Sequence, residues 1–535
     1  MEMAMGIGGG VQQHQLQQKG DAVLLAGAAA IVVVAFSLLL YTRMKKQLRR
    51  KRALFPRSPP GAWPVVGHLP LFLKDRPHQL LAELCMKQGY GPIMGLRLGV
   101  HPAIVVSSAA AAKELLSTQD KVFANRVHYA FADHVFYGYN KALGFSSYNP
   151  RWVQMRKLYT LELFTAKRLQ EMAHIRHEEM RKLLHRLQQA SNGGVQAVDL
   201  RERLFEMAGD IAARQFYSKT LGESAPELPH LVEAMEDEAF PTLGDYLPWL
   251  RFLDVFPKRG MDKLHRSLDR VFTSIIDERR RHMATCPANQ LPNDFLQVLL
   301  SKEESVVPEQ NICDNDIKAI LLDVLSGSIH TSSVTLEWAL ALLMSNPECM
   351  RKLREEVDSV SKHKDGRALL TNEDVEKAMP YLENVMKETL RVQPVAPLLL
   401  PRVSGEECHM GQYTLPKGTQ AFVHVWAIAR DPQIYEDPLS FRPERFDGTD
   451  LDVRGQHYEL LPFGAGRRMC PGMRGGLAVL YLTLANLIKF FEWEMPPGQT
   501  LDMSEKAYRG FSKEIPLRVI PKLRHYPLPD PLTHI

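Results

Sequence analysis

The sequence has little cysteine for its length and no closely paired cysteines. Its 535 residues include six cysteines, and no two of them stand in a CxxC arrangement. Structural zinc sites and disulfide frameworks usually depend on such pairs, so we expect neither here. Sparse, scattered cysteine is typical of a reducing compartment. The six are Cys85, Cys286, Cys313, Cys349, Cys408 and Cys470.

An excess of charge of one sign is also lacking. The formal net charge is +5, and the basic residues do not gather into patches of the kind that bind nucleic acid, so no nucleic-acid partner is expected. After about residue 70 the chain lacks low-complexity stretches and internal repeats, which argues against a repeat architecture. One dense basic run stands out, with seven Lys and Arg residues between Arg43 and Arg52.

An uncharged apolar segment precedes this basic run. Residues 22–41 read AVLLAGAAAIVVVAFSLLLY. A helix of this length spans about 30 Å, the thickness of a bilayer core. A cleaved signal peptide has a shorter apolar core of about 7–15 residues and carries its positive charge on the other side. A buried helix of a soluble core is the other alternative. The sequence predicts a transmembrane anchor at 22–41, a short lumenal N-terminus at 1–21 and a cytosolic body.

Proline and glycine are concentrated just after the anchor. Residues 42–69 form a predicted basic and proline-rich hinge, in which Pro56, Pro59 and Pro60 exclude a regular helix. From residue 70 to 535, amphipathic helical patterns dominate, and short β-like runs appear near both ends. We expect one catalytic domain over 70–535, mainly α with small β-sheets, an α+β fold.

The most informative stretch is Phe463–Gly472, which reads FGAGRRMCPG. Its glycines allow the backbone to approach a neighbour closely, and Cys470 stands just before an apolar helical run at 477–491. The helix N-terminus and the charge of Arg468 favour a thiolate. Such a thiolate is suited to be the axial ligand of a haem iron. On composition alone, a buried cysteine beside a tight turn is the ordinary alternative.

The same stretch matches the pattern FxxGxRxCxG without a gap, and in this it resembles the cytochrome P450 family. The resemblance extends over essentially the whole chain. It implies the cytochrome P450 fold and a haem b cofactor, with Cys470 as axial thiolate and metal ligand. It also implies that Phe463 and Arg468 belong to the haem-binding loop.

An ExxR motif supports the resemblance. Glu388 and Arg391 lie three residues apart on a predicted helix, so they share one face and can pair. Arg445 follows within the run FRPERF. The resemblance implies that these three side chains form a structural ion-pair group behind the haem. A buried glutamate between two arginines would satisfy its charge through bidentate hydrogen bonds.

A WxxxR motif supports it as well. Trp152 and Arg156 lie on one face of a predicted helix. The resemblance implies that both contact a haem propionate, together with Arg468 and Arg402. Buried carboxylates require cationic partners, which explains why the family places arginines there.

The stretch SGSIHTSS at 326–333 lies midway along a long apolar helical run, and its Gly and Ser residues suggest a bend. The family pattern here is Ala/Gly-Gly-x-Asp/Glu-Thr. Thr331 matches the catalytic Thr, whereas His330 stands at the acid position and Ser328 at the second Gly. Histidine can relay protons to bound dioxygen. Alternatively, it fills space, binds substrate or marks altered oxygen chemistry.

The resemblance implies a monooxygenase that uses dioxygen and NADPH-derived electrons, delivered by NADPH-cytochrome P450 reductase. The loop PFGAGRRMCPG and the hinge look most like the plant microsomal branch, located in the endoplasmic reticulum membrane. The run LELFTAKRL at 161–169 resembles plant hydroxylases of phenylpropanoids and flavonoids, which suggests a small apolar or phenolic substrate. The alternatives are an atypical haem-thiolate isomerase or dehydratase, an oxidase of a terpenoid or amino-acid-derived substrate, and a non-enzymatic haem sensor.

Aromatic residues follow Arg126 closely, in a region that covers the substrate pocket in the family. Aromatic walls with a few polar groups suit a small planar ligand, although simple core packing is the ordinary reading of each residue. The expected pocket residues are Tyr129, Phe131, Phe136, Thr335, Val395, Leu399 and Phe511.

Overall fold

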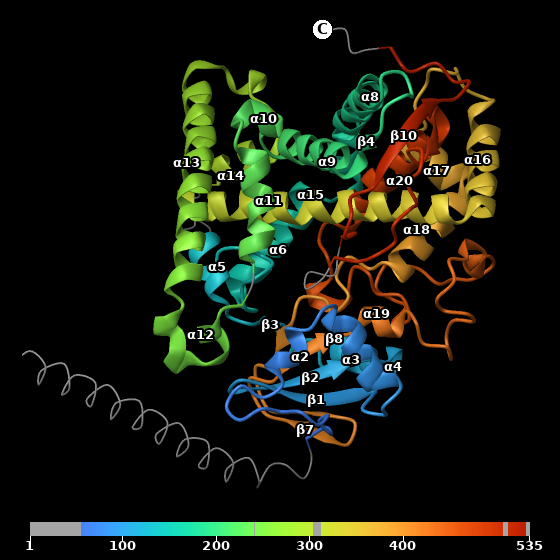
Figure 1. Ribbon diagram of the computed structural model, residues 1–535. Helices are drawn as coiled ribbons and strands as arrows, with labels where there is room; N and C mark the ends of the chain where they lie inside the picture. Colours follow the sequence, from blue (N-terminus) through green and yellow to red (C-terminus); the bar gives the residue numbers. More distant parts are fainter. Residues whose placement is uncertain (1–54, 240, 303–311, 507–511, 531–535) are drawn as a thin grey trace, which may run out of the picture.

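The structure is a computed structural model that describes residues 55–239, 241–302, 312–506 and 512–530. The predicted lumenal segment, the anchor at 22–41 and Phe511 lie outside the described residues. Helices make up most of the described chain, as predicted (Figure 1). They are α2 (Leu69–Phe72), α3 (Pro77–Met86), α4 (Ala109–Lys113), α5 (Ala130–Val135), α6 (Pro150–Glu162), α7 (Ala166–Glu171), α8 (Ala173–Ala190), α9 (Leu200–Tyr217), α10 (Leu221–Ser224), α11 (Leu228–Glu238), α12 (Leu243–Tyr246), α13 (Val255–Thr285), α14 (Phe295–Ser301), α15 (Asp314–Ser345), α16 (Pro347–Ser361), α17 (Asn372–Ala378), α18 (Pro380–Val392), α19 (Val425–Ile428) and α20 (Met473–Phe490).

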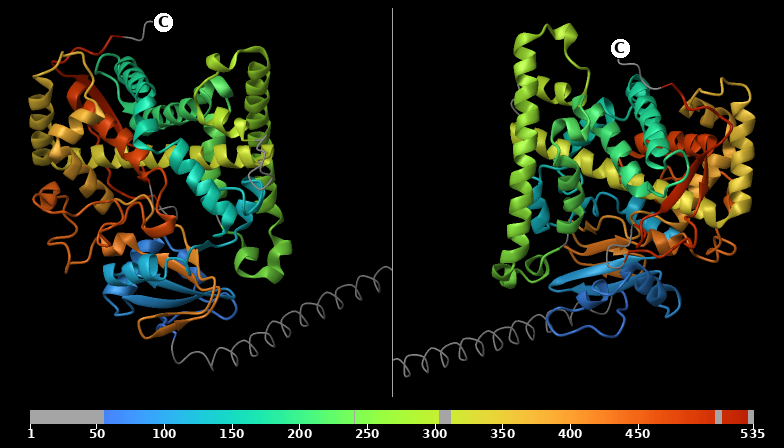
Figure 2. Two further views of the ribbon diagram at one scale, coloured as in Figure 1. Left: turned by 180° about the vertical axis from the view of Figure 1, so that it is seen from behind. Right: turned by 45° about the horizontal axis from the view of Figure 1, so that its top comes forward.

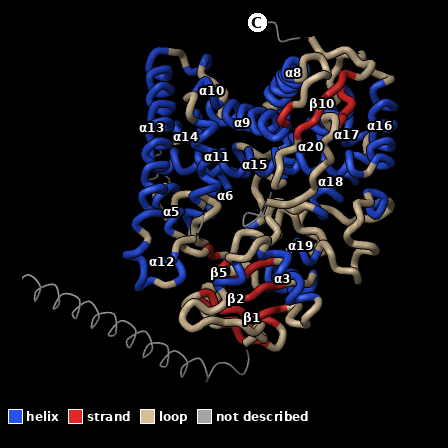
Figure 3. Tube along the Cα trace, in the orientation of Figure 1, coloured by secondary structure: helices blue, strands red, loops and turns tan. Residues whose placement is uncertain are grey.

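The strands form small sheets, and the largest lies at one end of the molecule, at the bottom of Figure 3. Its five strands run in the order β1-β2-β8-β5-β3, with β2 parallel to β8 and the other pairs antiparallel. A three-stranded sheet has the order β4-β10-β9, and β6 pairs with β7. The strands are β1 (Ile93–Leu98), β2 (His101–Val106), β3 (Asn125–Arg126), β4 (Val198–Asp199), β5 (Arg402–Val403), β6 (Cys408–Met410), β7 (Tyr413–Leu415), β8 (Gln420–Val423), β9 (Phe491–Glu494) and β10 (Arg518–Leu523).

Helix α15 is the centre of the helical body. It crosses the molecule in each view, with other helices on both sides (Figure 2). Its first turn carries Asp314 and Asp316, which suit the positive end of the helix dipole. It ends at Ser345, with Asn346 as its C-cap before Pro347. Of the described helices it alone is long and apolar enough to cross a membrane, but most of its apolar stretch is buried inside the protein. It is therefore a core helix.

The described part of the predicted hinge packs on the large sheet. The amide of Gly95 in β1 donates to the carbonyl of Arg57 at 2.8 Å, and the amide of His68 donates to that of Arg97 at 2.6 Å. A Cβ on Gly67, whose φ is +67°, would lie 2.2 Å from the carbonyl oxygen of Arg97. This close approach requires glycine. The second half of the predicted hinge thus runs along the edge of the domain.

Candidate active site

A glycine-rich turn presents Cys470 just before helix α20. The amide of Cys470 donates to the carbonyl of Phe463 at 2.9 Å, which closes the turn. Gly464 and Gly466 have φ values of +68° and +70°, a region that favours glycine. A Cβ on Gly466 would lie 2.3 Å from the carbonyl oxygen of Leu116, so the turn packs tightly on the neighbouring segment.

The environment of the Cys470 thiol combines burial with converging positive charge. Burial raises its pKa, whereas hydrogen bonds from the amides of Gly472 and Met473 and the charge of Arg156 lower it. The two amides lie at the N-terminus of α20, where a helix stabilises an anion. A metal cation in place of the thiol proton would offset the cost of burying the thiolate. The surroundings of Cys470 therefore fit a metal bound by a thiolate, such as a haem iron.

A group of three arginines, of which Arg402 and Arg468 are buried and Arg126 is partly buried, lies beside this loop. Burial lowers the pKa of Arg468 to about 9 and that of Arg402 to about 10. Burial also lowers the pKa of Arg126 well below its ordinary value, and the charges of Arg468 and Arg402 lower it further. Asp120 pairs with Arg402 at 3.4 Å. Positive charge still exceeds negative charge in this group, which therefore fits the two propionates of a haem.

The site also includes Arg126, which belongs to none of the sequence motifs described above. It lies on β3, where it pairs in register with Arg402 of β5. Its Nε donates to the carbonyl of Gly144 at 3.0 Å and its Nη1 to that of Leu400 at 2.7 Å. Arg402 is 276 positions from Arg126 in the sequence, so the two arginines become neighbours only through the pairing of strands β3 and β5.

Trp152 and Arg156 occupy different places around the loop. Trp152 is buried, and its Nε1 donates to the carbonyl of Leu143 at 3.1 Å. The guanidinium of Arg468 lies over its ring, 4.3 Å from the centroid, in a cation–π contact. Arg156, one turn along α6, is close enough to Cys470 to influence its pKa. The WxxxR motif thus lies between the arginine group, which Trp152 contacts, and the Cys470 thiol, near which Arg156 lies.

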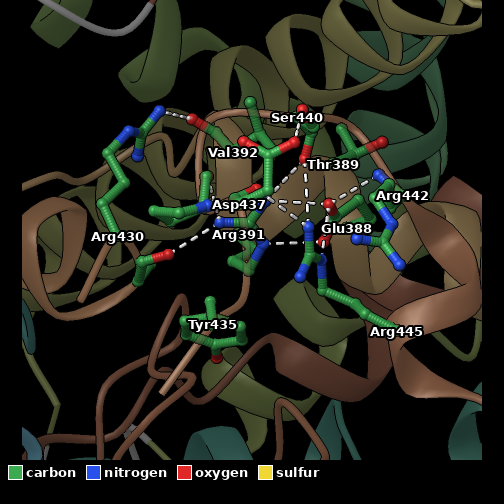
Figure 4. Close-up of polar contacts among 12 residues, drawn as sticks. Glu388, Thr389, Arg391, Val392, Arg430, Tyr435, Asp437, Ser440, Arg442 and Arg445 are labelled. Atoms are coloured by element: carbon green, nitrogen blue, oxygen red, sulfur yellow. Dashed lines mark hydrogen bonds and ion pairs between the residues drawn. The ribbon is translucent and has the colours of Figure 1, made fainter. Parts of the chain in front are cut away.

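The predicted ion-pair group is present and buried (Figure 4). Arg391 donates to both carboxylate oxygens of Glu388, from Nε at 2.7 Å and from Nη2 at 2.8 Å. Arg445 donates to the same carboxylate from Nε at 2.9 Å, and so does the backbone amide of Arg442 at 2.8 Å. The remaining donors of Arg391 reach the carbonyls of Ala429, Pro438 and Ser440. These contacts tie α18 to the long segment that leads towards the cysteine loop.

Helix α15 has an open stretch midway along its length. Gly327 and Thr331 are exposed, although most residues of this helix are buried, and a Cβ on Gly327 would meet no atom within 4 Å. The hydroxyl of Thr331 donates to the carbonyl of Gly327 at 2.9 Å. His330 is partly buried, and its carbonyl accepts from the Ser333 hydroxyl at 3.0 Å. The helix continues through this stretch without a break.

Comparison with known proteins decides the family. Residues 56–520 match the sequence model of the family described as Cytochrome P450. The chain belongs to the cytochrome P450 family. It is 37% identical to cytochrome P450 71D2 of Catharanthus roseus over 493 residues, which cover 90% of this chain and 94% of the relative. It is also 37% identical to flavonoid 3'-monooxygenase CYP75B137 of Crocosmia x crocosmiiflora over 498 residues, or 89% and 95% of the two chains.

A solved structure agrees with this assignment. Zebrafish cytochrome P450 with abiraterone is similar with a TM-score of 0.69 and 25% identity, covering 84% of this chain and 100% of that chain. The protein is therefore a P450 monooxygenase, an oxidoreductase that incorporates oxygen. Its cofactor is haem, which this family binds through a cysteine thiolate, and NADPH supplies electrons through a reductase. The family, the fold and the cofactor predicted from the sequence are confirmed.

In this P450, the aromatic residues expected in the pocket lie mainly in the protein interior. Phe131 and Phe136 are buried, with ring centroids 5.6 Å apart, and both pack on Phe145. Tyr129 is partly buried, and its hydroxyl bonds to that of Tyr246. Burial raises the pKa of Tyr129 well above its ordinary value.

Of the other expected pocket residues that the structure describes, Thr335 lies beside the open stretch and Leu399 beside the cysteine loop. The hydroxyl of buried Thr335 donates to the carbonyl of Thr331 at 2.7 Å. Leu399 has a φ of +48°, and its side chain lies 3.5 Å from the position of a Cβ on Gly464. Val395 is partly buried and packs against the hydrophobic core that includes residues of α15, α18 and α20. Their contacts with a substrate stay predictions.

Proposed function

We propose that this P450 hydroxylates a small aromatic molecule of the phenylpropanoid or flavonoid type. The observation that carries this proposal is the 37% identity, over nearly the whole of both chains, to a flavonoid 3'-monooxygenase. The run LELFTAKRL at 161–169, which resembles plant hydroxylases of phenylpropanoids and flavonoids, supports it. Oxidation of a terpenoid or an amino-acid-derived substrate is the alternative.

We assign the haem to the cysteine loop and the arginine group. Cys470 would hold the iron, and Arg126, Arg402 and Arg468 would hold the propionates, with Trp152 supporting Arg468. When bound, the haem supplies the iron that activates dioxygen. The Thr331 hydroxyl, exposed on the open stretch of α15, would pass a proton into the site, and His330 beside it would resupply that proton. The open stretch at Gly327 leaves room for the reacting atoms.

The experiment is a reduced carbon-monoxide difference spectrum of the full chain in microsomes, with Cys470→Ser as the control. We expect a Soret band of thiolate-ligated haem that is lost in the variant. Reductase, NADPH and dioxygen labelled with ¹⁸O are then added to matched panels of flavonoids, phenylpropanoids and terpenoids. Labelled hydroxylation confined to the aromatic panels supports the proposal. Turnover of terpenoids alone, or turnover without NADPH, contradicts it.

We also propose that the protein is anchored in the endoplasmic reticulum membrane by the helix at 22–41, with its catalytic domain in the cytosol. A surface of the described domain supports this. The segment 248–256, which follows α12 and includes the first two residues of α13, exposes Trp249, Phe252, Leu253, Val255 and Phe256. Exposed apolar patches of this kind mark interaction or membrane surfaces. The amide of Val100, at the β1–β2 turn, donates to Tyr246 of α12, so the patch lies near the sheet on which the hinge packs.

A further inference from the structure

Helix α15 carries a partly buried carboxylate, Asp323, which belongs to no sequence motif of the site. Asp323 lies about two turns before Thr331 and accepts three hydrogen bonds. The amide of Leu143 donates to its Oδ2 at 3.0 Å, the amide of Gly144 to its Oδ1 at 3.3 Å, and the hydroxyl of Tyr159 to its Oδ2 at 3.0 Å. Within the described residues, Asp323 forms no salt bridge. Its partners are two backbone amides and one phenol.

The carbonyls of the same two peptides serve the arginine group. The carbonyl of Leu143 accepts from the Nε1 of Trp152 at 3.1 Å and from the Nη1 of Arg468 at 3.2 Å. The carbonyl of Gly144 accepts from the Nε of Arg126 at 3.0 Å. A short piece of backbone therefore bridges Asp323 on one side and three residues of the proposed propionate site on the other.

The fit between Asp323 and this backbone is close. A Cβ on Gly144 would lie 3.0 Å from the Oδ1 of Asp323, so a larger residue there would press on the carboxylate. Burial raises the pKa of Asp323 to about 6, against the three hydrogen bonds and the charge of Arg126, which lower it. The two peptides that donate to Asp323 also hold Arg126, Arg468 and Trp152, and this shared backbone points to a role in the site.

We propose that Asp323 is a positioning residue of the haem site. By holding the amides of Leu143 and Gly144, it orients the carbonyls that fix Trp152, Arg468 and Arg126. The proposal rests on the propionate-binding role assigned to these arginines above. Asp323 acts through them and does not touch the haem itself.

The measurement is the rate of haem transfer from the holoenzyme to excess apomyoglobin. Asp323→Asn places an amide group against a backbone N–H and should raise this rate on the order of 10-fold, because groups that orient the residues holding a cofactor contribute to its affinity. The carbon-monoxide band of thiolate-ligated haem should stay in place, because Cys470 is untouched. Tyr159→Phe removes one bond to Asp323 but leaves the bridge intact, and it should change the rate less than about 2-fold.

A double-mutant cycle separates positioning from a general loss of stability. If Asp323 acts in part through Arg468, then Asp323→Asn should speed haem loss less in Arg468→Lys than in the wild type, because coupled sites are non-additive. Additive rates would overturn the proposal. So would an unchanged rate in Asp323→Asn.

Gly144→Ala provides a second variant that keeps the carboxylate, in case Asp323→Asn does not accumulate. It should also speed haem loss, whereas the matched Gly222→Ala, whose Cβ meets no atom within 4 Å, should not. Equal rates for these two variants would contradict the positioning role. A wild-type protein without the thiolate band would instead contradict the proposed function, so the two failures are distinguishable.

Discussion

At the scale of the single residue, His330 is one of two departures from the family pattern on helix α15, and Ser328 is the other. If His330 resupplies the proton that Thr331 delivers, His330→Asp should keep product formation within a few-fold, because Asp also transfers protons. His330→Gln cannot do so, and it should lower product formed per NADPH by at least about 10-fold and release more hydrogen peroxide. Product, NADPH and peroxide are measured together. Full coupling in His330→Gln would mean that the proton comes from elsewhere.

His424 sets a pH dependence of stability. Its Nε2 contacts the carbonyl of His78 at 2.8 Å and its Nδ1 accepts from the amide of Ala427 at 3.2 Å, so the neutral ring is fully paired. Burial lowers its pKa to about 3 from the usual 6.5. As the pH falls, the unfolded chain therefore takes up a proton at His424 before the folded chain does. The stabilisation that this group contributes is fully present above pH 6.5 and decreases as the pH falls towards 3.

From pH 7.5 to 5.0 this single group should remove about 2 kcal/mol from the free energy of unfolding. Urea unfolding at the two pH values checks it. The loss should shrink in His424→Gln, which has no ring proton to gain. A loss that is equally large in wild type and variant would show that other groups dominate.

The residues that a continuous motif contains were predictable from the sequence. Cys470 and Arg468 belong to one ten-residue stretch, and Glu388 and Arg391 share a helical turn. Asp323 and Arg126 were not given a role, because their partners come from distant segments. A strand register brings Arg126 to Arg402, and a helix crossing brings Asp323 to the backbone at 143–144. Neither contact leaves a local pattern.

At the scale of the element, the Glu388 group joins helix α18 to the segment at 436–445. Glu388 accepts four donors and is fully buried, so Glu388→Ala would leave Arg391 and Arg445 unpaired in the interior. Breaking one side of a buried ion pair costs about 3–5 kcal/mol. We expect that loss in the free energy of unfolding, with poor haem incorporation. Arg442→Ala is the matched control, because only its backbone contacts Glu388, and it should change stability by less than about 0.5 kcal/mol.

The helices themselves were predictable, whereas their arrangement was only partly so. Apolar periodicity marked the long core helix, observed as α15 over Asp314–Ser345. The Gly and Ser residues at 326–333 suggested a bend, but the hydroxyl groups of this stretch find hydrogen-bond acceptors without one. Ser326, Ser328 and Thr331 each donate to a carbonyl three or four residues earlier in the unbroken helix. Short hydroxyl side chains can thus be accommodated without ending the helix.

At the scale of the whole molecule, the mainly helical fold with small sheets followed from the order of the patterns, but the sheet topology did not. Strands β2 and β8 are parallel neighbours, although more than 300 residues separate them. No local pattern specifies such a pairing. The packing of the hinge on β1 was equally hidden, because proline-rich sequence predicts a spacer whether or not a surface is available to it.

The apolar patch at 248–256 gives a prediction about the molecule as a whole. If this patch enters the lipid, a chain without residues 1–41 should still bind neutral liposomes. Phe252 and Phe256 are 70% and 79% exposed. Changing both to Asp removes two large apolar side chains, each of which stabilises binding by about 1.5–3 kcal/mol when buried. Liposome co-sedimentation should therefore weaken by at least about 10-fold.

Val195→Asp is the matched control, because Val195 is 71% exposed but lies next to β4, in a different part of the domain. It should leave co-sedimentation unchanged. If the control weakens binding as much as the double change, charge rather than the patch explains the loss. If neither changes binding, the domain touches the membrane through another surface, and the orientation inferred from the hinge and the patch is wrong. If only the double change releases the protein from liposomes, then α12, the β1–β2 turn and the hinge face the membrane. The protein would then bind its apolar substrates at the lipid in which they dissolve.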